Sequence, residues 1–80
     1  MENLKNSSLA YSANVKMQLN VNGLVLPIGQ LGPGFLILRN APDYPPVKAE
    51  IEMWIDDDES RWSVYLPDGI SAAKTRTKIT

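Results

Sequence analysis

The chain has 80 residues, of which 44% are hydrophobic and 21% are charged, and its net charge at pH 7 is −1. A chain of this length buries roughly 63% of its surface on folding, which suffices for one compact core but not for a deep enzymatic cleft beside it. Cysteine and histidine are both absent. Their absence excludes disulfides, thiolate or imidazole metal sites, and every mechanism with a Cys nucleophile or a His base. We therefore expect one small domain that is not an enzyme and needs no cofactor.

The charges are unevenly distributed along the chain. Residues 41–70 carry eight acidic and two basic side chains, whereas residues 71–80 carry three basic side chains and no acidic one. Affinity for nucleic acid depends mainly on neutralising phosphates, so the central acidic block argues against a nucleic-acid partner. The apolar run at 35–38 is far shorter than the ~18 residues of a membrane span, and no apolar signal segment begins the chain. We expect no membrane partner, and cytoplasm is the default location.

The first part of the chain predicts an arm followed by a tight hairpin. Residues 1–14 are rich in Asn and Ser and have no apolar period, which is typical of a mobile N-terminal arm. From Lys16 to Val21, apolar and polar residues alternate as in a half-buried strand. Asn22-Gly23 tolerates the positive φ angles of a type I′ turn. Residues 24–28 then form the second strand, with Pro27 at a sheet edge or at the end of a ladder.

The next segments alternate between irregular and extended structure. Residues 29–34 (GQLGPG) contain three glycines and a proline, which predicts a loop. Residues 35–39 form a short apolar strand, which we expect to be central. Residues 40–46 (NAPDYPP) contain three prolines, which limit the backbone donors and predict a second irregular connection.

A second hairpin follows at residues 48–66. Apolar side chains alternate with polar ones along residues 48–55 and again along residues 61–66. A loop at residues 57–60 would place three apolar pairs on one face, namely Ile55 with Trp62, Met53 with Val64, and Ile51 with Leu66. A slip by one residue would place each of them against a polar side chain, so this register is well specified.

The end of the chain leaves two alternatives open. Pro67-Asp68-Gly69 indicates a turn that returns Ile70 to the core. Residues 72–80 are either a basic tail or a weak sixth strand, since β-branched residues alternate with basic ones there. We therefore predict an all-β fold with one domain at residues 15–71. Its five to six short antiparallel strands, arranged in hairpins, would form a small sandwich or a partly open barrel.

The predicted register also suggests a binding face. It places Trp54 and Tyr65 as diagonal neighbours on the face opposite the core, flanked by Glu52 and Arg61. Paired aromatic rings with polar neighbours are typical of protein-binding hot spots and of sugar-stacking surfaces. We expect a non-catalytic module that binds a protein through this face or through an open sheet edge, with a second copy of the chain among the candidates. A carbohydrate on the aromatic face is one alternative ligand. In the other reading, these rings are simply covered by another part of the chain.

The acidic turn is the densest cluster of oxygen donors in the sequence. It comprises Asp56, Asp57, Asp58 and Glu59. Such a run is a candidate for weak binding of a divalent cation, although it lacks the alternating spacing and central glycine of a dedicated calcium loop. The competing interpretation is a solvated hairpin tip whose charges limit edge-to-edge association.

Three segments carry a resemblance. Residues 26–39 (LPIGQLGPGFLILR), residues 50–55 and residues 61–71 (RWSVYLPDGIS) together resemble small uncharacterised bacterial proteins of unknown function. The resemblance covers roughly residues 17–72. It implies a free-standing bacterial protein and carries no activity, cofactor or site residue.

Overall fold

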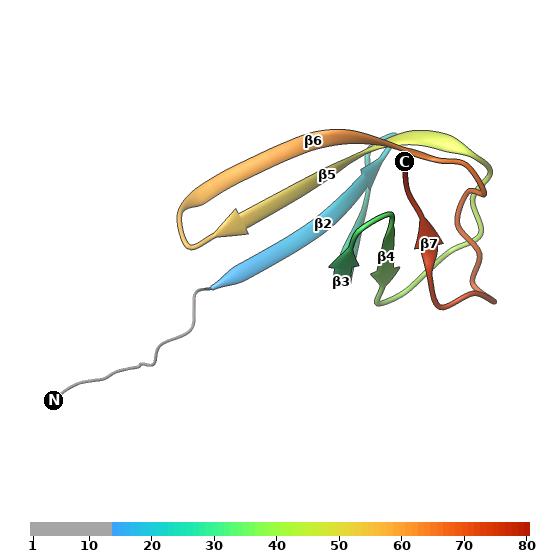
Figure 1. Ribbon diagram of the computed structural model, residues 1–80, viewed down its shortest axis with the longest axis horizontal. Coiled ribbons are helices and arrows are strands. Elements are labelled where there is room, and N and C mark those ends of the chain that lie inside the picture. Colours follow the sequence, from blue (N-terminus) through green and yellow to red (C-terminus); the bar gives the residue numbers. More distant parts are fainter. Residues whose placement is uncertain (1–13) are drawn as a thin grey trace, which may run out of the picture.

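The computed structural model describes residues 14–80, which contain no helix and six strands. These are β2 (Val15–Val21), β3 (Leu24–Gly32), β4 (Phe35–Leu38), β5 (Val47–Ile55), β6 (Asp58–Leu66) and β7 (Thr77–Lys78). Every neighbouring pair is antiparallel, and the single sheet has the order β6-β5-β2-β3-β4-β7. The sheet curls into a partly open barrel (Figure 1). The predicted all-β class is confirmed, and the barrel is the architecture that forms.

The hydrophobic core lies on the inner face of this curl. Successive side chains of a strand point to opposite faces, so the apolar members of each alternating pattern converge inside. Leu19, Leu36, Ile51 and Leu66 are fully buried. The other buried apolar residues are Val21, Leu26, Ile28, Leu38, Ala49, Val64 and Ile70.

The C-terminal residues help to close the barrel. The strand alternative for residues 72–80 is the one that forms, because β7 pairs with β4. Beyond β7, the amide of Ile79 donates to the carbonyl of Gly34 at 3.1 Å. Thr80 and Tyr65 exchange two backbone hydrogen bonds of 3.0 and 3.1 Å. These residues therefore join the β4 side of the sheet to β6 at one end of the barrel.

The first hairpin forms as predicted, but the loop expected after it does not. Asn22 and Gly23 have φ angles of 52° and 88°, as a type I′ turn requires. The prediction of a loop over residues 29–34 was wrong, because β3 continues to Gly32 and only Pro33 and Gly34 form a turn. An irregularity in the β3–β4 register between Ile28 and Gln30 accommodates Gly29. Glycine inside a strand often marks such a bulge.

The register of the second hairpin was also predicted wrongly. The turn contains only Asp56 and Asp57, so Ile55 pairs with Asp58 and each partner moves by four residues. The observed pairs are Ile51 with Trp62, Ala49 with Val64, and Val47 with Leu66. A two-residue turn allows three further cross-strand pairs that a loop at residues 57–60 would have lost. Because four is even, every side chain keeps its predicted face although its neighbours change.

The two irregular connections meet beside the barrel. Tyr44 and Ile70 form an isolated bridge, with backbone hydrogen bonds of 2.7 and 2.8 Å. Gly69 has a φ of 65°, and a side chain at this position would collide with the backbone of Tyr44. Ile70 is only 3% exposed, which confirms the predicted turn back onto the core.

Candidate functional site

A three-stranded sheet projects from the barrel where β2 and β3 separate. The β2–β3 ladder ends at the pair Gln18–Pro27, whereas β2 stays paired with β5 as far as Val15 and Ile55. Proline has no backbone N–H to continue a ladder, and β3 follows β4 from this point. We call residues 15–18 of β2, 52–55 of β5 and 58–62 of β6 the projecting sheet (Figure 1).

One face of the projecting sheet is apolar and uncovered. It continues the core-facing side of the same strands, because Leu19, Ile51 and Trp62 lie in one row. The next row contains Met17, Met53 and the small Ser60, and the outermost row contains Val15, Ile55 and the charged Asp58. We call Val15, Met17, Met53, Ile55 and Trp62 the apolar patch.

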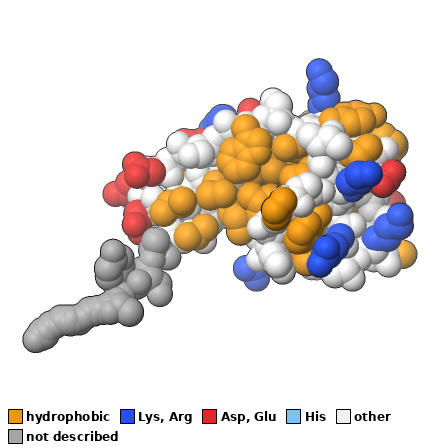
Figure 2. Space-filling model, viewed as in Figure 1, with side chains coloured by type: hydrophobic (Ala, Val, Ile, Leu, Met, Phe, Trp, Pro, Cys, Tyr) orange, Lys and Arg blue, Asp and Glu red, His pale blue; other side chains and the backbone are white. Residues whose placement is uncertain are grey.

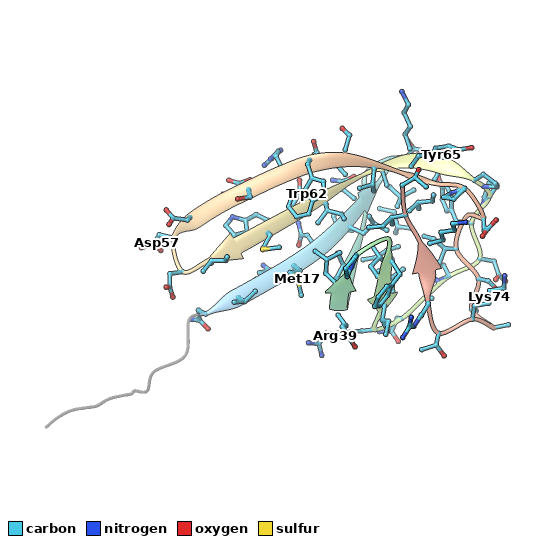
Figure 3. The ribbon with its side chains drawn as sticks, viewed as in Figure 1. Met17, Arg39, Asp57, Trp62, Tyr65 and Lys74 are labelled. Atoms are coloured by element: carbon cyan, nitrogen blue, oxygen red, sulfur yellow. The ribbon has the colours of Figure 1, made fainter. Side chains whose placement is uncertain are left out.

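The exposure of the apolar patch rises toward the tip of the projecting sheet. Trp62 is 38% exposed, Ile55 45% and Val15 54%, and the two methionines are half-buried. Figure 2 shows a continuous hydrophobic surface over this part of the molecule, and Figure 3 places Trp62 and Met17 on it. These side chains follow the same alternating pattern as the core residues of their strands, but they are exposed to solvent.

The predicted aromatic pair is not brought together. Trp54 lies opposite Glu59 and Tyr65 lies opposite Lys48, so the two rings are six residues apart along the hairpin, or about 20 Å. Trp54 instead carries the Lys16 ammonium 5.5 Å from its ring centroid, and Tyr65 is 43% exposed. This separation is a correction to the predicted binding face and removes the two-ring platform that sugar stacking would use.

Glu52 and Arg61, the other two predicted residues, do meet on the polar face of the projecting sheet. Glu52 is buried and accepts a hydrogen bond of 2.6 Å from Gln18 Nε2. Arg61 Nη1 lies 3.6 Å from Glu52 and 3.7 Å from Glu50, and the guanidinium is also hydrogen-bonded to Glu59. That hydrogen bond, reinforced by the nearby negative charges, raises the pKa of Arg61 above its ordinary value.

The three glutamates on this face, Glu50, Glu52 and Glu59, surround the Arg61 guanidinium. Arg61 lies near three carboxylates and offsets one of their three negative charges. These contacts form an ion-pair network on the polar face.

The acidic turn does not form a coordination shell. Asp56 has a φ of 54°, and its Oδ1 accepts a hydrogen bond of 3.0 Å from the Asn14 amide. Glu59 is engaged by Arg61. Within residues 14–80, no group of three or more acidic side chains is arranged to hold a metal ion.

The same part of the chain has no helix that could cross a membrane.

A shallow hollow lies in the fork between β2 and β3. It is lined by Val15, Met17, Pro27, Gly29 and Arg39, together with neighbouring residues of the same strands. Lys16 and Arg39 are the charged residues of this lining. The hollow thus places a guanidinium beside the apolar patch.

The apolar patch is the feature that sequence reasoning missed. The alternation predicts Met53, Ile55 and Trp62 on the core-facing side of their strands, and the structure places them on that side. The alternation does not show how far the neighbouring strands extend, and β3 separates from β2 at Pro27. The proline in the second predicted strand was the one available signal of that departure.

Comparison of the chain with protein-family models, with curated proteins and with solved structures finds no match.

Proposed function

We propose that this chain is a non-catalytic β-sheet module that binds a protein through the apolar patch. The observation that carries the proposal is that a core-facing sheet surface continues beyond the barrel without a cover from residues 14–80. Water around exposed apolar side chains is released when a partner covers them, which favours association. Contiguous apolar surface on a small domain commonly marks such a site.

The composition of the apolar patch also suits a protein partner. Trp62 supplies a large aromatic surface, and tryptophan is enriched among the residues that dominate binding energy. Met17 and Met53 add flexible side chains that adapt to a partner's shape. Charged side chains such as Lys16, Glu52 and Arg61 lie on the opposite face, so a partner need not desolvate them.

Two other exposed hydrophobic residues provide a matched control. Leu24 and Val25 are 43% and 47% exposed, close to the values of Ile55 and Val15. As consecutive residues of β3 they point to opposite faces, so they do not form a shared surface. A change at these two positions removes similar apolar area without touching the apolar patch.

The experiment is affinity capture from a bacterial lysate that also contains an untagged copy of the chain. The wild type is compared with the double variants Val15→Ser, Ile55→Ser and Leu24→Ser, Val25→Ser. We expect the wild type and the Leu24/Val25 variant to retain the same protein, and the Val15/Ile55 variant to lose it. Retention of nothing, or equal retention by all three folded proteins, would overturn the proposal.

A further inference from the structure

We propose that the occupant of the apolar patch is a second copy of this chain, packed face to face in an antiparallel two-fold arrangement. This inference rests on the proposed function and names its partner. In this arrangement the apolar patches of the two copies cover each other. The acidic turn of each copy then lies on the barrel side of the other copy's apolar patch, toward Arg39.

The first support is that the apolar patch suits its own copy. A two-fold interface brings the same surface of both chains together, so it must be self-complementary. A sheet face that is apolar except for Asp58 at its tip meets this condition, because two such faces pack about 10 Å apart with interdigitated side chains. Within the patch, the half-buried methionines lie between Trp62 and the Val15–Ile55 row, so the large ring of one copy faces smaller side chains of the other.

The second support is the distribution of charge along the molecule. Acidic side chains gather at the tip of the projecting sheet, while basic ones gather over the barrel (Figure 2). Asp57 and Lys74 lie at opposite ends of the long axis, and Arg39 lies on the barrel side of the fork (Figure 3). Arg39 also lines the hollow next to Val15 and Met17. The charge therefore changes sign across the apolar patch.

This change of sign selects the antiparallel arrangement. With the two copies antiparallel, the acidic turn at residues 56–59 of one chain approaches Arg39 of the other. With the copies parallel, the two acidic turns would meet, which costs free energy through repulsion between like charges.

The first experiment is sedimentation equilibrium of the purified full chain from about 1 µM to about 1 mM, a range that covers weak dimers. We expect the average mass to rise toward twice that of the monomer. The Val15→Ser, Ile55→Ser variant should dissociate at least about tenfold more readily, and the Leu24→Ser, Val25→Ser variant should match the wild type. A wild type that stays monomeric throughout, or equal dimerisation of both variants, overturns the inference.

A second set of variants tests the antiparallel direction without changing apolar residues. Asp57→Lys, Asp58→Lys should weaken the dimer about tenfold at low salt, and Arg39→Glu should weaken it as well. All three changes in one chain should restore it. Failure of the threefold variant to recover overturns the proposed direction, provided that circular dichroism shows a folded sheet in each protein.

The two proposals fail in different ways. A purified chain that remains monomeric while lysate capture retains a different protein through the apolar patch overturns the second copy and keeps the binding module. A monomeric chain that captures nothing overturns both. Dimerisation that the Val15/Ile55 variant abolishes supports both.

Discussion

The two halves of the β5–β6 hairpin have the same alternation but different surroundings. In the barrel half, Ile51 and Leu66 are fully buried because β3, β4 and the C-terminal residues close over them. In the projecting half, Ile55 occupies the same side of β5 and is 45% exposed. The comparison teaches that a period of two specifies which side chains share a face. It does not specify whether that face is covered.

The largest expected effect separates the two halves directly. Ile51→Ala should lower the free energy of unfolding by about 2–5 kcal/mol, because it removes buried methyl groups and leaves a cavity. Ile55→Ala, on the same face of the same strand, should cost less than about 1 kcal/mol, because water already reaches that side chain. Urea unfolding of both variants measures the difference. Similar losses would show that the projecting half is as well packed as the barrel.

The second effect concerns the edges of β6. Deletion of Ile79 and Thr80 removes three backbone hydrogen bonds that close the barrel, and we expect a loss of about 2 kcal/mol. Hydrogen exchange provides the specific readout. The Tyr65 amide should be protected in the full chain and become unprotected after the deletion.

The amide of Ser63 is the internal control for that experiment. The Ser63 and Tyr65 amides point to the same side of β6, because the two residues are two positions apart. Thr80 bonds to Tyr65 and does not reach Ser63. We expect the Ser63 amide to exchange quickly in both proteins. An unchanged Tyr65 amide after the deletion would contradict closure through Thr80.

The smallest effect is expected on the polar face of the projecting sheet. Arg61→Gln removes a surface ion pair with Glu59 and two longer contacts, and exposed pairs of this kind are weak and screened by salt. The pKa of Arg61 is raised on folding, so its contribution is complete below the unfolded pKa and is lost only as the pH rises through the folded pKa. Thermal unfolding from pH 6 to 9 should therefore show a small shift that does not depend on this titration. A shift as large as that of Ile51→Ala would contradict a surface role.

Much of the local structure was predictable from particular residues. Asn22-Gly23 indicated its turn because few other dipeptides accept two positive φ angles. The alternation along β2, β5 and β6 placed each side chain on its correct face. The register of β5 and β6 was not predictable in the same way. Moving the partners by four residues preserves every face, so the hydrophobic pattern cannot distinguish the two registers.

The candidate site required the tertiary structure. Whether Trp54 and Tyr65 meet depends on a turn of two or four residues, and acidic residues at positions 56–59 suit both lengths. The sequence by itself determined an all-β chain, its hairpins, and the division of each strand into apolar and polar faces, because these follow from local sterics and side-chain alternation. Only the tertiary structure decided that β3 leaves β2 at Pro27 and that the apolar patch is uncovered. Coverage depends on which distant strands reach a surface, and no local pattern encodes that distance.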